Sequence, residues 1–214
     1  MIFRLIDLAW LPESPEDFRN RCKAVDAMPE RSDALRTLAN YRLDINKLSR
    51  LARSVDLARR EGALAHLHPL RLGLLSNATT DLLVPALIAS ALRHGIALEV
   101  VEAPFDQAMQ VAIDSDSIVN RASPDVVLLA FDHRALGLTG LMNKPDAADH
   151  SIEKIRRIKD GIHAGCGAPL ILQTIPTPPE SLFGSLDRYA KESRSAAIDN
   201  VNHQLAEICA TTDD

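Results

Sequence analysis

Four short apolar runs restrict the folds open to this chain more than any other feature. They lie at 70–76, 96–102, 126–131 and 170–175, and they alternate with segments of helical character. The runs are largely continuous in apolar residues, as is typical of parallel strands whose two faces are both covered by helices. We therefore predict an α/β fold: a flavodoxin-like, doubly wound parallel sheet of three layers, with strand order 2-1-3-4.

Helices are expected between these strands and after the last one. The expected ranges are 82–94, 105–112, 151–163 and 186–209. Pro85 is tolerable because it falls in the first turn of its helix, and Gly95 ends that helix. The segments 139–150 and 177–181 are predicted to be loops, the second because it contains Pro178 and Pro179.

The first 66 residues differ, because they have the pattern of helices only. Pro15 is expected to open a helix that runs to Met28 with Ser14 as its cap, and Asp44 to cap another that Gly62 ends. We predict an N-terminal helical extension over 1–66 and the α/β domain over 67–214. Trp10, beside Leu8, is interpreted either as packing on the main domain or as a docking anchor.

Composition and targeting signals exclude several classes of protein. The chain has 214 residues, 46% of them hydrophobic, and a net charge of −5, which suits a globular protein and gives no reason to expect a nucleic-acid partner. The apolar run 82–92 is too short to cross a membrane, and the N-terminus lacks the features of a secretory signal. Cys22, Cys166 and Cys209 are odd in number and scattered. We therefore expect a cytoplasmic protein without a disulfide framework.

Ligands of such folds bind at the carboxyl ends of the strands, near the point where the strand order reverses. The loop after the first strand offers Ser76, Asn77 and Thr79, which either face a ligand or, with Thr80 and Asp81, cap the next helix. After the third strand, Asp132 and His133 are candidates for acid–base chemistry, with Arg134 for an anionic group. The alternative is a local salt link at the strand end.

Other polar clusters give weaker signals. His66 and His68 have no neighbouring carboxylate or Cys, and His163 with Cys166 is better explained by a helix C-terminal turn, so no metal site is predicted. Lys47, Arg50 and Arg53 lie on one basic helix face. That face is either a solvated surface or a docking site for an acidic partner.

Nearly the whole chain resembles the N-terminal region of FkbH-like proteins. The lead-in motifs LAWLPESPEDF and LANYRLDINKLSRLAR are followed by the similar stretch LGLLSNATTDLLVPALIASALRHGIALEVVEAPFDQ. The resemblance continues through DSDS, SPDVVLLAFDHRAL and LILQTIPTPPESLFGSLD, and it includes Asn202 in the last helix. Each motif alone has low specificity, and the resemblance depends on their order and spacing.

The resemblance implies an SGNH-hydrolase-like domain that precedes a haloacid-dehalogenase-type (HAD) domain. In the family, the HAD domain carries an Asp-x-Asp-x-Thr motif, uses magnesium, and loads glyceryl from 1,3-bisphosphoglycerate onto an acyl carrier protein for polyketide extender-unit synthesis. No Asp-x-Asp-x-Thr occurs in this chain. We therefore expect an isolated N-terminal piece without a cofactor of its own, whose partners are the carrier protein and the absent HAD domain.

Compared with working SGNH hydrolases, the motifs are incomplete. Their Gly-Asp-Ser nucleophile motif corresponds here to Ser76-Asn77-Ala78, and the Asn of their Gly-x-Asn-Asp motif corresponds to Asp132. Asp199 and His203 do not have the spacing of the late Asp-x-x-His pair. The implied function is non-catalytic: carrier-protein docking through Lys47, Arg50 and Arg53, or scaffolding. The alternatives are a divergent esterase or acyltransferase that uses Ser76 or Thr79, and a structural module that forms homodimers.

Overall fold

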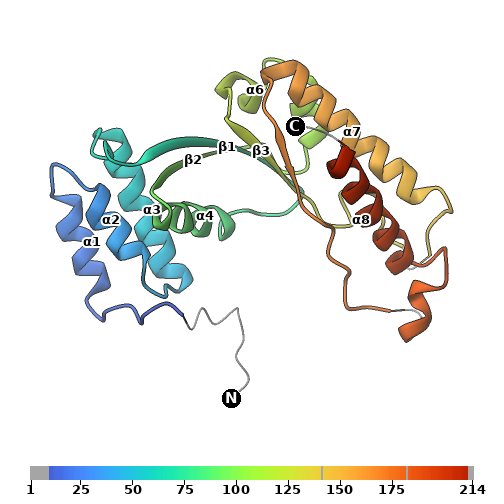
Figure 1. Ribbon diagram of the computed structural model, residues 1–214, viewed down its shortest axis with the longest axis horizontal. Coiled ribbons are helices and arrows are strands. Elements are labelled where there is room, and N and C mark those ends of the chain that lie inside the picture. The colour runs from blue at the N-terminus through green and yellow to red at the C-terminus, as the bar shows by residue number, and fades with distance from the viewer. Residues whose placement is uncertain (1–9, 141, 182, 212–214) are drawn as a thin grey trace. The chain divides into compact units, whose positions relative to one another are not determined.

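The computed structural model describes residues 10–140, 142–181 and 183–211 of the chain (Figure 1). Its elements, in chain order, are α1 (Phe18–Asp26), α2 (Ser32–Ala39), α3 (Ile45–Arg60), β1 (His68–Ser76), α4 (Leu83–Arg93), β2 (Ile96–Glu102), α5 (Ala108–Ile113), α6 (Ile118–Ala122), β3 (Val126–Ala130), α7 (Ala147–Cys166), β4 (Leu170–Leu172), the 3-10 helix η2 (Gly184–Arg188) and α8 (Arg194–Thr211).

The strands form one four-stranded sheet in the order β2-β1-β3-β4, which confirms the predicted fold class and strand order. β1 and β3 pair in parallel, with Leu72 opposite Val126 and Ser76 opposite Ala130. β3 and β4 also pair in parallel, over three residues of each strand. This register places the carboxyl ends of β1 and β3 side by side.

The chain divides into two compact units, each made of two segments. Unit 1 comprises the described residues up to Arg71 together with Thr80–Val100, and unit 2 comprises Leu72–Thr79 together with the described residues from Val101 onward. This division runs through β1 rather than at residue 66. The folding of 67–214 as a separate domain therefore stays a prediction.

Unit 1 is built from α1 to α4. Its core contains Phe18, Cys22, Leu35 and Leu51, all at most 2% exposed. The predicted Asp44 cap is confirmed, because its Oδ1 accepts the Lys47 backbone N–H at 2.9 Å.

Three expectations for the N-terminal segment can be compared with unit 1. The predicted Ser14 cap is wrong: α1 begins at Phe18, and the Ser14 hydroxyl instead accepts a hydrogen bond from Lys47 Nζ at 2.7 Å. Trp10 is 56% exposed, so packing leaves more than half of its surface open. Leu8 lies outside the described residues.

Unit 2 is built around β3, β4 and helices α5 to α8. Ile152, Ile155, Ile158 and Ile162 form the buried stripe of α7, as predicted. That helix already begins at Ala147, so the last four residues of the predicted loop 139–150 are helical.

Two elements of unit 2 differ from the prediction, and side chains bind the backbone near both places. β4 stops at Leu172, and the Asn202 side chain binds the N–H of Ile175 at 2.7 Å and its C=O at 2.9 Å. The predicted helix 186–209 is broken into η2 and α8. At the break, the Ser193 hydroxyl donates to the Asp187 carbonyl and accepts the Ala196 N–H.

The loop after β2 also differs from the prediction. α5 begins at Ala108 rather than Phe105, because Asp106 has a φ of 54°, which a helix cannot accommodate. The sequence analysis did not find α6, which has only five residues.

Within the described residues, no helix combines the length and the apolar character that a membrane span requires.

Candidate functional site

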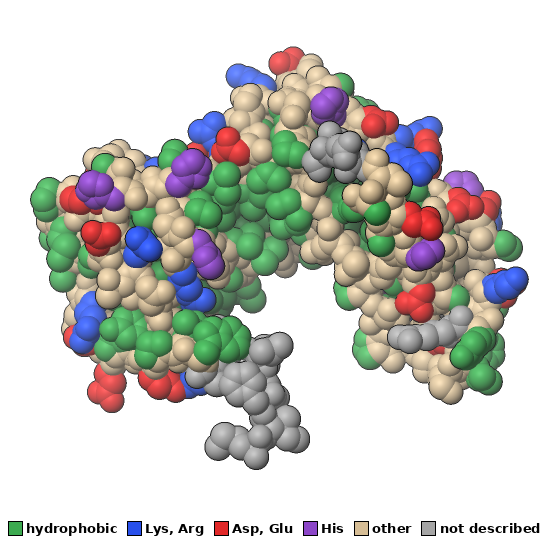
Figure 2. Space-filling model, in the orientation of Figure 1, with side chains coloured by type: hydrophobic (Ala, Val, Ile, Leu, Met, Phe, Trp, Pro, Cys, Tyr) green, Lys and Arg blue, Asp and Glu red, His purple; other side chains and the backbone are tan. Residues whose placement is uncertain are grey.

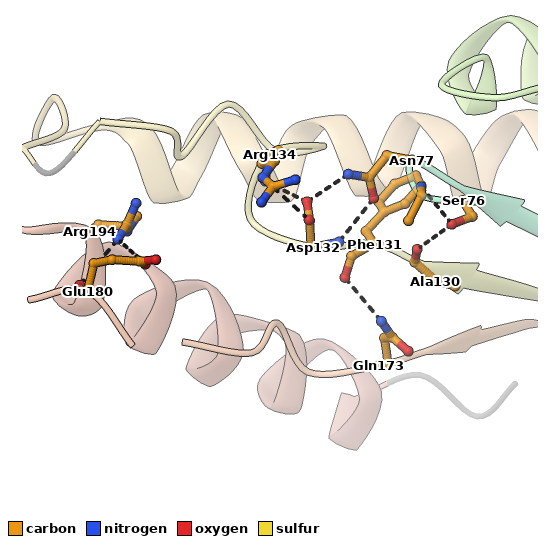
Figure 3. A network of polar contacts seen from close by, with 10 residues as sticks. Ser76, Asn77, Ala130, Phe131, Asp132, Arg134, Gln173, Glu180 and Arg194 are labelled. Carbon is orange, nitrogen blue, oxygen red and sulfur yellow. Dashed lines mark hydrogen bonds and ion pairs between the residues drawn. The ribbon is translucent and has the colours of Figure 1, made fainter. Parts of the chain in front are cut away.

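Polar side chains gather where β1 and β3 end, at the edge that the fold favours for ligands. Ser76 is the last residue of β1 and lies opposite Ala130, so Asn77 and Asp132 follow the two strand ends as neighbours. Figure 3 shows these residues together with those that follow β4. All of them belong to unit 2.

Asn77 and Asp132 hold each other through reciprocal hydrogen bonds. The Asn77 amide Nδ2 donates to Asp132 Oδ1 at 2.7 Å, and the Asp132 backbone N–H donates to Asn77 Oδ1 at 3.1 Å. The same Oδ1 of Asp132 accepts the backbone N–H of Arg134 at 2.8 Å. We call this arrangement the Asn77–Asp132 clamp; it ties the loop after β1 to the loop after β3.

The environment of Asp132 favours its ionised form. Partial burial acts to raise the pKa of this carboxyl, but the hydrogen bonds from Asn77 and from the Arg134 backbone, with the nearby His133, outweigh burial and lower the pKa below its ordinary value. The carboxylate is thus negatively charged at neutral pH. It offers acceptors but no proton to a ligand.

Ser76 is fixed by the backbone rather than presented to a ligand. Its side chain is buried, the hydroxyl donates to the Ala130 carbonyl at 3.2 Å, and Oγ accepts the Ala78 N–H at 3.0 Å. Thr79 is exposed. The N-cap position of α4 is Leu82, which makes no side-chain cap, and the Leu83 and Val84 N–H groups donate to the Thr80 carbonyl at 2.9 Å.

His133 and Arg134 face different surroundings although they are adjacent in sequence. His133 is buried, and its ring has no hydrogen bond to another described residue. The Arg134 side chain is 72% exposed and lies 3.8 Å from Asp132 Oδ2. The local salt link is therefore what forms between Asp132 and Arg134, and no hydrogen-bonded acid–base pair is assembled.

The segment after β4 adds contacts that the sequence analysis did not single out. Gln173 Nε2 donates to the Phe131 carbonyl at 3.1 Å, and Arg194 Nη2 lies 3.2 Å from Glu180 Oε2 (Figure 3). Gln173 is a polar residue directly after an apolar strand, and this pattern could have identified it as a site residue. Nothing in the sequence connects Arg194 with Glu180.

The three predicted docking residues on α3 differ in their availability. Lys47 is 3.3 Å from Asp44 Oδ2, and Arg50 pairs with Asp26. Arg53 is exposed and has no ion-pair partner among the residues that the structure describes. Figure 2 shows Lys and Arg side chains interspersed with Asp and Glu, as such local pairing produces.

The described residues do not fit a magnesium ion at the clamp. Magnesium prefers several hard oxygen ligands, whereas Asp132 supplies the clamp's single carboxylate and its Oδ1 already accepts two N–H groups. No group of three His, Cys, Asp or Glu suited to a metal occurs in the described part of the chain, and His66 and His68 are exposed. Gly167 ends α7 in a left-handed turn, which confirms the interpretation of the His163–Cys166 segment.

Comparisons with known proteins support the predicted context. The N-terminal part of a Bacteroides fragilis protein that contains a phosphatase domain, solved in complex with Mg, matches with a TM-score of 0.60 and 20% identity. The match covers 69% of this chain and 39% of that chain, so this chain spans well under half of it, and at this identity the likeness shows the fold alone. No curated protein matches. The family model described as "FkbH, N-terminal domain" matches residues 71–214, which is more than half of the sequence, and the chain therefore belongs to the FkbH N-terminal domain family.

Proposed function

We propose that this chain is a non-catalytic N-terminal domain that binds an acyl carrier protein in an FkbH-like protein. A separate HAD-type domain of the parent protein would load glyceryl from 1,3-bisphosphoglycerate onto that carrier. Family membership supports the FkbH-like context. The relationship to SGNH hydrolases is part of the proposal.

The Asn77–Asp132 clamp is the observation that carries the non-catalytic role. Acyl transfer requires a nucleophile, a base beside it and donors for an oxyanion. The Ser76 hydroxyl instead donates to a backbone carbonyl, Ala78 has no hydroxyl, and Asp132 is a carboxylate that would repel a developing oxyanion. The polar groups at this edge thus hold two loops together.

Carrier docking is supported by the exposed side of α3. Arg53, Leu57 and Arg60 follow one another at helical spacing and lie on one stripe, which we call the α3 stripe. Both arginines are exposed and have no ion-pair partner among the described residues, and Leu57 is 37% exposed. An apolar side chain flanked by cations suits the acidic helices of a carrier protein. Arg53 thus remains from the predicted docking set, while Lys47 and Arg50 are occupied locally.

Titration of the chain with an acidic holo acyl carrier protein tests this proposal. We expect saturable binding that the double variant Arg53→Glu/Arg60→Glu weakens about tenfold, because charge reversal at an exposed rim costs on the order of 1–2 kcal/mol. Higher salt should weaken the native complex and have less effect on the variant. Arg121→Glu, an exposed charge change in unit 2, should leave the affinity unchanged.

Two results would contradict the proposal. Carrier binding that is absent, or equal in the native chain and the double variant, would remove the α3 stripe as the docking site. Hydrolysis of p-nitrophenyl acetate above the buffer rate, abolished by Ser76→Ala, would remove the non-catalytic role.

A further inference from the structure

A cavity of about 220 Å³ lies within unit 2, between α7, α8 and β4. Its walls include Leu170 and Leu172 of β4 and Ile208 of α8. The residues that precede β4 also line it, which places it toward the amino end of that strand. The Asn77–Asp132 clamp lies at the carboxyl ends of the neighbouring strands, so the two sites are separate.

The size of the cavity limits what it can hold. An apolar cavity of about 150 Å³ is enough for benzene, whereas sites for drug-sized ligands begin near 300 Å³. The value of 220 Å³ falls between these limits. A ligand of roughly ten non-hydrogen atoms therefore fits this volume.

Three side chains of the cavity lining carry polar groups. Lys159 and His163 lie one turn apart on α7, and Cys209 contributes a thiol from α8. An ammonium group and an imidazole next to aliphatic walls match a molecule with an anionic head and an apolar body.

We propose that this cavity binds a small carboxylate with an aliphatic body, of about the size of octanoate. The carboxylate lies against Lys159 and His163, and the hydrocarbon chain contacts Leu170, Leu172 and Ile208. This proposal does not depend on the carrier-binding function, which concerns unit 1.

Octanoate is the probe for the test, and calorimetric titration of the full chain is the measurement. We expect saturable binding of octanoate and at least fivefold weaker binding of 1-octanol, which has the same tail without the charge. Acetate, which has the head group alone, should not bind. Lys159→Met should weaken octanoate binding at least fivefold and leave 1-octanol unaffected, whereas Arg156→Met on the same helix, outside the cavity lining, should change neither.

Alkylation of Cys209 by iodoacetamide, followed by peptide mass spectrometry, gives a second measurement. Octanoate should slow modification of Cys209, which lines the cavity, and should not affect Cys166, which does not. Ile208→Trp fills the cavity and should abolish both binding and protection. If that variant does not fold, as judged by circular dichroism, Lys159→Met still decides the question.

Three outcomes would overturn the proposal. Octanoate that neither binds nor protects Cys209 would show that the cavity is not a ligand site. Equal affinity of octanoate for the native chain and Lys159→Met would show that the head group is not recognised. Protection that rises with protein concentration without octanoate would show that a second copy covers this region, because β4 is the outermost strand of the sheet order.

Discussion

At the residue scale, Asp132 connects the local chemistry of the site to the stability of the fold. Its folded-state pKa lies below the ordinary value of 3.8 because hydrogen bonds to the carboxylate outweigh partial burial, with His133 contributing. A lowered pKa means that this carboxylate stabilises the fold above the unfolded-state pKa. That contribution is lost as the pH falls through the folded-state pKa.

Asp132→Asn should therefore lower the free energy of unfolding by about 1 kcal/mol at pH 7, because a hydrogen bond to a charged group contributes about 1.5–3 kcal/mol when buried and solvent screens this partly exposed one. The difference between native chain and variant should stay constant above the ordinary pKa of 3.8 and shrink as the pH falls below it, because the carboxyl of the native chain then takes up a proton. Urea unfolding at several pH values measures it. Asp160→Asn, an exposed position, serves as the control, and a difference that grows on acidification would refute the assignment.

At the scale of elements, the position of α7 depends on two glycines. A Cβ added at Gly165 would lie 2.5 Å from Asn120 Nδ2, and one added at Gly161 would lie 2.8 Å from the Ala112 carbonyl oxygen. Asn120 is 3% exposed and its amide donates to carbonyls around α5, with the shortest contact at 2.8 Å to Asp114. The Asn120 side chain therefore cannot move away from an added Cβ without losing these hydrogen bonds.

Gly165→Ala is expected to destabilise the protein by about 1–2 kcal/mol. Overpacking costs roughly 1–3 kcal/mol, and the better helix propensity of alanine offsets part of that cost. Thermal or chemical unfolding measures the change. Ala164→Leu, at an exposed position on the same helix, should stay within about 0.5 kcal/mol, and a Gly165→Ala variant more stable than the native chain would contradict the close approach.

The same scale explains which elements could be predicted from sequence. The parallel α/β class follows from the alternation of apolar runs with helices, and the strand order is that of the flavodoxin-like type of this class. Asn77 and Asp132 were candidates because each follows a strand. That they bind each other across 55 positions was not predictable, because local pattern carries no partner information. The contact of Asn202 with the backbone of Ile175, 27 positions away, was not predictable for the same reason.

At the scale of the whole molecule, the packing of α4 bears on whether a domain boundary lies at residue 66. It packs against α2 and α3 in unit 1, and its Ile88, Ala89 and Leu92 are buried in that core. A chain cut at the predicted boundary would expose these residues, and burying an Ile or a Leu contributes about 1.5–3 kcal/mol each.

Expression of residues 67–214 alone should therefore give a protein that binds a hydrophobic dye and aggregates, while the full chain does neither. Dye fluorescence and light scattering measure the difference. A soluble, monomeric 67–214 with a cooperative thermal transition would instead confirm the boundary predicted at residue 66.

The division of β1 between the two units has a consequence for synthesis on the ribosome. Helices α1 to α3 are made first, but their core lacks α4 and β2 until Val100 has emerged. Until then the nascent helices present their apolar side chains, including Leu51 and Val55, to solvent or to a chaperone. Ribosome-associated chaperones should therefore contact this chain most strongly before residue 100 leaves the exit tunnel, and release it once that segment has closed over the helices.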